Sequence, residues 1–159
     1  MGNAAGMEKT VLFFHLLGAL VFVAGIVLAA AAFEAARRRE RVEEVALHLS
    51  LTQAGAKLVA FGGLLLFVCG LWLVELAEIG FGTGWVTAAM ALFVIAAVLG
   101  GLGGQRPKQA RELAARLAAE GKPRSEELGA LLDDPRSRLA NYASSALILI
   151  VLGLMVFKP

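Results

Sequence analysis

The chain has 159 residues, of which 58% are apolar, and a formal net charge of +2. A soluble domain of this length is about 45–50% apolar, so the composition excludes an ordinary water-soluble globular domain. The small net charge is uninformative by itself, and no nucleic-acid partner is expected.

The apolar residues gather in four blocks. The cores of these blocks, residues 11–33, 58–74, 85–104 and 139–157, contain no charged side chain apart from the ionisable His15. About 20 helical residues cross the ~30 Å hydrocarbon core of a bilayer, and a helix satisfies its own backbone there. The sequence therefore predicts transmembrane helices at about residues 10–33, 58–79, 85–104 and 139–157.

The segment between the first two predicted spans is charged, but its sequence is still typical of helices. The first helix is expected to continue past residue 33 into an Arg-rich run. Residues 42–51 have an amphipathic pattern, with apolar side chains at helical spacing. This pattern suits a helical extension of the second span. Gly80, Gly82 and Gly84 predict a tight turn before the third span.

The long segment between spans three and four predicts short helices. Pro107 is expected to begin one of them, and Ser125 is placed to cap a second. Asp134 is then expected to cap the last span, with Pro135 at its first helical position, a favoured arrangement.

Basic residues concentrate in two loops, residues 34–57 and 105–138, which hold 13 of the 15 Lys and Arg side chains. Because positive loops stay cytoplasmic, both termini, including Lys158, are expected outside. The basic patch either sets this topology alone or also holds anionic lipid head groups. The expected fold is all-α: residues 1–159 form one membrane domain, an antiparallel up-and-down four-helix transmembrane bundle with short cytoplasmic helices between spans three and four.

Glycines recur on the first two spans at a common spacing. Gly18 and Gly25 match Gly63 and Gly70, 45 residues further along the chain. Small residues let membrane helices approach closely, so these four glycines are expected to pack helices together. Either an internal duplication or chance similarity between apolar segments explains the match.

His15 is the most informative polar residue. It shares one helix face with Gly18, Phe22 and Gly25, and an ionisable side chain in hydrocarbon usually faces protein. Three interpretations fit. His15 binds haem b or a metal ion through its imidazole, it forms a proton site with Glu75, or it makes a single hydrogen bond that fixes packing.

Sulfur-containing residues offer a weaker metal hypothesis. Met90 and Met155 fall near the depth of His15, with Cys69 nearer the middle of the membrane, and soft sulfur ligands suit copper. No M-x-x-M or C-x-x-C spacing supports it. His48 lies on the cytoplasmic side and is therefore excluded as a second haem ligand beside His15 within one chain.

Glu75 has its own simpler interpretation. It lies about one helical turn before Glu78, so the two carboxylates are expected on one face. If the span ends near Val74, both carboxylates are interfacial. No sequence motif of a hydrolase is present, and the sequence leaves open whether the protein is an enzyme.

Several short motifs resemble those of a bacterial family of predicted integral membrane proteins, domain of unknown function 2269. They are the His-Leu-Leu-Gly-Ala run beginning at His15, Gly25, the Gly-Leu-Trp run beginning at Gly70, and the ending from Met155 to Pro159. The resemblance covers essentially the whole chain and implies four spans, with no established activity.

The first helix is also distantly similar to copper-resistance D-type and haem-biosynthesis membrane domains, which implies haem or copper as the ligand of His15. The sequence departs from that pattern at Phe22, where tryptophan is common, and at Ala24, where a glycine is common.

Three functions therefore fit the sequence. The first is a small membrane protein that binds haem b or a metal ion through His15. The second is a non-catalytic accessory or assembly subunit, acting as a homo-oligomer or with a membrane-complex partner. The third is a small transporter or proton-coupled element that uses His15 and Glu75.

Overall fold

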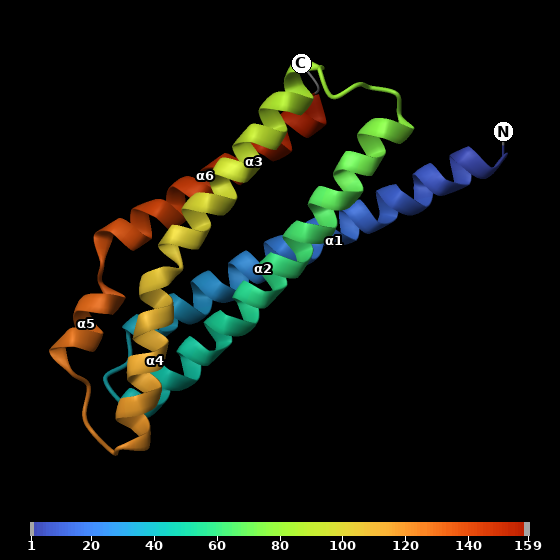
Figure 1. Ribbon diagram of the computed structural model, residues 1–159. Helices are drawn as coiled ribbons and strands as arrows, with labels where there is room; N and C mark the ends of the chain where they lie inside the picture. Colours follow the sequence, from blue (N-terminus) through green and yellow to red (C-terminus); the bar gives the residue numbers. More distant parts are fainter. Residues whose placement is uncertain (1, 158–159) are drawn as a thin grey trace. The chain divides into compact units, whose positions relative to one another are not determined.

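The computed structural model describes residues 2–157, and within that range every regular element is an α-helix (Figure 1). The helices are α1 (Gly2–Arg37), α2 (Val42–Leu76), α3 (Gly84–Gly103), α4 (Gln105–Ala119), α5 (Glu126–Leu132) and α6 (Pro135–Phe157). In the described range, four segments containing α1, α2, α3 and α6 are long and apolar enough to cross a membrane. The all-α membrane fold is thus confirmed. Lys158 lies outside the described residues.

The first two helices are longer than their apolar blocks. Helix α1 has 36 residues and α2 has 35, so each is about 50 Å long, well beyond the ~30 Å of hydrocarbon. The amphipathic segment from residue 42 is continuous with span two, as predicted. Its apolar positions Val42, Val45 and Leu49 are buried, so this end of α2 packs against protein.

Helix α2 ends earlier than predicted, at Leu76 rather than near residue 79. Glu78 adopts a left-handed backbone with φ of 53°. The N–H groups of Glu78 and Ile79 donate to the carbonyls of Glu75 and Val74, over 3.1 and 3.2 Å, which is a Schellman motif. The expectation that Glu75 and Glu78 share a helix face is therefore wrong, because Glu78 lies beyond the helix end.

The predicted caps in the third loop are confirmed. The Ser125 hydroxyl accepts a hydrogen bond from the backbone of Leu128, and Asp134 accepts one from the backbone of Ser137 over 2.9 Å. Pro135 is the first residue of α6. Helix α4 begins at Gln105, two residues before the predicted start at Pro107. Proline is tolerated in this first turn because its missing N–H would have no partner there.

The chain forms two compact units. The first comprises the described residues up to Glu34 together with Ser50–Phe81, and the second comprises Ala35–Leu49 and the described residues from Gly82 onward. Each unit contains one antiparallel pair of membrane helices: α1 with α2 in the first, and α3 with α6, side by side in Figure 1, in the second.

The first pair is held by two glycine contacts. A methyl group on Gly25 would lie 2.8 Å from the Gly55 carbonyl oxygen, and one on Gly62 would lie 2.9 Å from that of Gly18. The two glycines of each helix are seven residues apart, which keeps them on one face. We call these four residues the glycine seam. Gly62 makes the close approach on α2, and the predicted Gly63 is buried beside it.

The second pair is held by side-chain hydrogen bonds to backbone carbonyls. The Ser137 hydroxyl and the Asn141 amide both donate to the carbonyl of Gly103, and the Ser144 hydroxyl donates to that of Ala96 over 2.8 Å. A methyl group on Gly103 would collide with the Asn141 side chain. Glycine on α3 thus leaves room for polar groups from α6.

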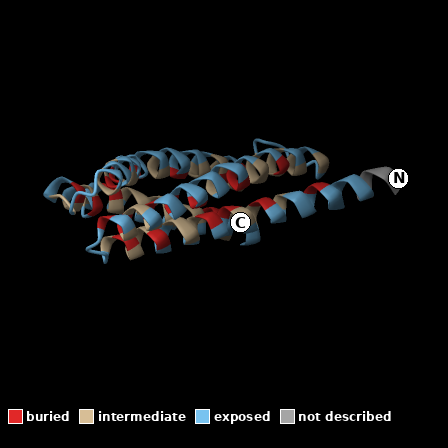
Figure 2. Ribbon diagram, turned by 90° about the horizontal axis from the view of Figure 1, so that it is seen from below, coloured by how far each residue is buried: buried red, intermediate tan, exposed pale blue. Residues whose placement is uncertain are grey.

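The best-buried apolar side chains lie outside the membrane pairs, in residues 35–49 and 105–134, which we call the basic cap. Figure 2 shows that the long helices carry mostly exposed surface, as expected where lipid covers them. The side chains of the cap with no exposed surface are Ala36, Val45, Leu49, Ala110, Ala114, Leu128 and Leu132.

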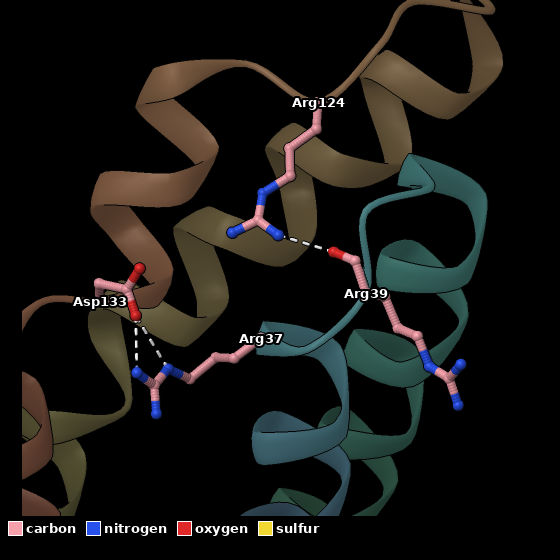
Figure 3. Close-up of polar contacts among 4 residues, drawn as sticks. All are labelled: Arg37, Arg39, Arg124 and Asp133. Atoms are coloured by element: carbon pink, nitrogen blue, oxygen red, sulfur yellow. Dashed lines mark hydrogen bonds and ion pairs between the residues drawn. The ribbon is translucent and has the colours of Figure 1, made fainter.

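Two arginines tie the cap together (Figure 3). At the end of α1, Arg37 donates from Nε and Nη2 to Oδ1 of Asp133, over 3.0 and 2.7 Å. Arg124 donates to the backbone carbonyl of Arg39 over 2.6 Å. These contacts link the α1–α2 connection to both ends of α5.

Gly62→Ala is expected to destabilise the protein by about 1–3 kcal/mol, because the added methyl group would lie 2.5 Å from the backbone nitrogen of Phe22. Gly153→Ala is the control, since nothing lies within 4 Å of its methyl group; it is expected to be neutral or slightly stabilising. The free energy of unfolding in mixed detergent micelles measures both. Equal effects would contradict the glycine seam.

Candidate functional site

His15 contacts the partner helix through one defined hydrogen bond. Its Nδ1 lies 2.9 Å from the carbonyl oxygen of Leu66 on α2. A carbonyl oxygen only accepts, so Nδ1 must carry the proton and donate. In the neutral imidazole this leaves Nε2 unprotonated, with a free lone pair.

Gly70 makes this contact sterically feasible. A methyl group on Gly70 would lie 3.1 Å from Cε1 and 3.4 Å from Nδ1 of His15. Gly70 is also one helical turn beyond Leu66, so its own N–H donates to the same carbonyl in a regular helix. The missing side chain therefore gives the imidazole access to a carbonyl that the helix already uses.

The other imidazole nitrogen, Nε2, has no partner among the described residues. Among residues 6–157, the hydrogen bond to Leu66 is the one polar contact of the His15 side chain. No unpartnered side-chain nitrogen in this range is buried, and His15 is half-buried, so Nε2 is accessible. The lone pair of Nε2 is therefore available to a ligand, which makes Nε2 the candidate binding atom of this site.

Exposed aromatic residues immediately precede His15. The rings of Phe13 and Phe14 meet edge-to-face with centroids 5.6 Å apart, and both side chains are exposed. This end of α1 therefore combines one free imidazole nitrogen with an apolar, aromatic surface.

Glu75 is not joined to His15. It is exposed in the last turn of α2, and the described residues show no hydrogen bond or ion pair between the two side chains. The proton-site hypothesis therefore has no direct contact to support it.

Two of the three predicted sulfur ligands belong to the second unit. Met90 lies on α3 and Met155 on α6, and both are half-buried. Cys69 is buried on α2. Within the described part of the chain, no group of three or more His, Cys, Asp and Glu residues is arranged to hold a metal ion. Nδ1 of His48 donates to the carbonyl of Glu44 within its own helix, over 2.7 Å.

Sequence reasoning identified His15 and Gly70 but not their connection. The acceptor is a backbone carbonyl of Leu66, and every residue carries a carbonyl, so no residue type marks it. The helical spacing from Leu66 to Gly70 would have suggested it only if the register of the two helices were known.

Gly70→Ala is expected to destabilise the protein by about 1 kcal/mol, because the methyl group displaces the imidazole from Leu66. In a His15→Ala background the same change is expected to be neutral or slightly stabilising, since the ring is gone. A double-mutant cycle on the free energy of unfolding measures the coupling. Additive effects would contradict the contact.

Comparison with known protein families shows what the chain is similar to. Residues 9–159 match a family described as "Predicted integral membrane protein (DUF2269)". Neither the curated proteins nor the solved structures contain a significant match.

Proposed function

The chain belongs to the DUF2269 family of predicted integral membrane proteins, and from this premise we propose that it is a small haem-binding membrane protein in which Nε2 of His15 ligates the iron of haem b. The observation that carries the proposal is the hydrogen bond from Nδ1 of His15 to Leu66. Histidines that ligate metals almost always donate their other N–H to a carbonyl or carboxylate, which orients the ring and raises its basicity.

The ligand count favours haem over a bare ion. A zinc or copper ion takes three or four protein ligands, whereas the described residues offer no cluster of three His, Cys, Asp and Glu side chains. A porphyrin supplies four nitrogen ligands itself, so one histidine is sufficient on the protein side. The exposed apolar surface around Phe13 and Phe14 suits the flat porphyrin face.

When bound, haem b would supply one-electron chemistry at the level of His15. The role of this chain would be to hold the imidazole in one tautomer, through Leu66, and to keep it in place beside Gly70. Any further ligand would have to come from a partner, such as a second copy of the chain.

The charge distribution supports an orientation for this site. With 13 of 15 basic residues in the two loops 34–57 and 105–138, the basic cap would face the cytoplasm of a bacterium and both termini would face outward. His15 would then lie in the outer half of the inner membrane.

The second candidate is an accessory or assembly subunit in which His15 only fixes packing. The observation that favours it is that the bond to Leu66 by itself joins α1 to α2, next to the glycine seam.

A visible absorption spectrum with haem quantification tests the proposal. The purified protein, with haem added, is expected to show a Soret band at about one haem per chain. His15→Ala should lose the band, and imidazole should restore part of it by filling the vacated position. His48→Ala is the matched control, because His48 bonds within its own helix, and it should bind haem normally.

Two outcomes would contradict the haem proposal. A wild-type protein that stays colourless after haem addition, or a His15→Ala variant that binds haem as tightly as wild type, would remove the haem proposal. Co-purification of a partner protein would then favour the accessory role.

A further inference from the structure

A cluster of cations lies where the second helix pair meets the basic cap. Helix α3 ends at Gly103, and the carbonyl of Gly103 accepts hydrogen bonds from Ser137 and Asn141 near the start of α6. These bonds place the two helix ends at one level. The cluster consists of Arg106 and Lys108 just after α3, and Arg136 and Arg138 on either side of Ser137.

The described residues do not neutralise these cations. Among the described residues, the side chains of Lys108, Arg136 and Arg138 have no hydrogen-bond or ion-pair partner, and that of Arg106 reaches only Gln109, over 3.5 Å. Other basic residues of the cap differ, since Arg37 is paired with Asp133 at 2.7 Å.

The acidic residues nearest the cluster in the sequence are otherwise engaged or too far away. Asp134 accepts from the backbone of Ser137 and caps α6, and Asp133 is paired with Arg37. Glu112 is one turn beyond Lys108 on α4 but forms no ion pair with it in the described range. The cluster therefore keeps an excess of positive charge.

Exposed apolar side chains adjoin the cluster on the membrane side. Arg136, Leu139 and Tyr142 follow one another at intervals of three on α6 and so share a face. Leu139 is 70% exposed and Tyr142 is 65% exposed. Leu102, one turn before Arg106, is also exposed. Cations therefore lie next to exposed apolar side chains both at the end of α3 and at the start of α6. In a membrane, lipid would cover these apolar side chains.

We propose that this cluster binds the phosphate head groups of anionic phospholipids, with their acyl chains against Leu102, Leu139 and Tyr142. The positive charge of the cluster suits a phosphate group, and the adjoining apolar helix faces suit the acyl chains of the same lipid molecule. A tyrosine at this depth is typical of the membrane interface. Basic residues next to a membrane segment attract anionic lipids in this way.

Nanodiscs that contain phosphatidylglycerol and phosphatidylcholine test the proposal independently of topology, because both leaflets are accessible in them. Lipids retained by the released protein are counted by native mass spectrometry. Wild type is expected to be enriched in phosphatidylglycerol, and Arg136→Gln combined with Arg138→Gln should reduce the enrichment at least about five-fold. Added salt should weaken it, because these charges are exposed.

The matched control removes two cations that already have partners. Arg41 is paired with Glu43 and Lys122 with Glu120, so the combined Arg41→Gln and Lys122→Gln variant changes the net charge equally and should keep the enrichment. Arg136→Lys with Arg138→Lys should also keep it, and helicity by circular dichroism shows that each variant is folded.

Three results would overturn the proposal. They are a wild type without preference for phosphatidylglycerol, a control variant that loses the preference as fully as the Arg136 and Arg138 variant, and millimolar inorganic phosphate that displaces the lipid completely. The last result would assign the cluster to free phosphate instead.

Discussion

The close approach of α1 and α2 at the glycine seam sets the geometry on which the candidate site depends. Lipid tails are as apolar as leucine, so no hydrophobic force drives membrane helices together, and packing and hydrogen bonds must do so. Backbone contact at Gly18 with Gly62, and at Gly25 with Gly55, brings the two helix surfaces close enough for an imidazole on one to reach a carbonyl on the other. Any wider spacing would leave Nδ1 of His15 without its acceptor.

The two pairs of membrane helices are held together by different kinds of contact. The first pair relies on glycine against glycine and adds one histidine. The second places glycine on α3 opposite serine and asparagine on α6, whose side chains bond to carbonyls. In the first pair a polar atom is left over, Nε2 of His15, and this difference makes that pair the candidate for ligand binding.

Most charged residues and the best-buried apolar side chains lie in other segments of the chain than the one that carries His15. The fully buried apolar side chains belong to the basic cap, where water makes the hydrophobic effect available. The cap has paired cations such as Arg37, whereas Lys108 within it and Arg136 just beyond it are unpaired among the described residues. Pairing stabilises the cap, whereas the unpaired cations at its membrane edge remain available to an external anion.

The sequence predicted what depends on local chemistry. The lengths of the apolar blocks predicted four spans. The residue types at Ser125 and Asp134 predicted the caps, because an N-cap side chain bonds to a backbone N–H only a few residues further along the chain. The end of α2 was misplaced because nothing at Glu78 marks a left-handed backbone.

Contacts between helices were predicted less well than the helices themselves. Gly62 and Gly55 were missed because antiparallel register decides which glycines meet, and a direct repeat such as Gly18 with Gly63 does not encode it. The Leu66 carbonyl was missed because it is backbone. His15, Gly18, Gly25 and Gly70 were identified because their residue types are unusual or small at a helical spacing.

The candidate site depends on Nδ1 of His15 carrying the proton, which leaves Nε2 free to bind. Nitrogen-15 NMR of the imidazole measures this directly, in protein labelled at histidine, with His48→Gln used to assign the signals. We expect the ligand-free protein at neutral pH to show Nδ1 of His15 protonated and Nε2 unprotonated. A protonated Nε2 with an unprotonated Nδ1 would contradict it, because that ring could neither donate to Leu66 nor offer Nε2 to iron.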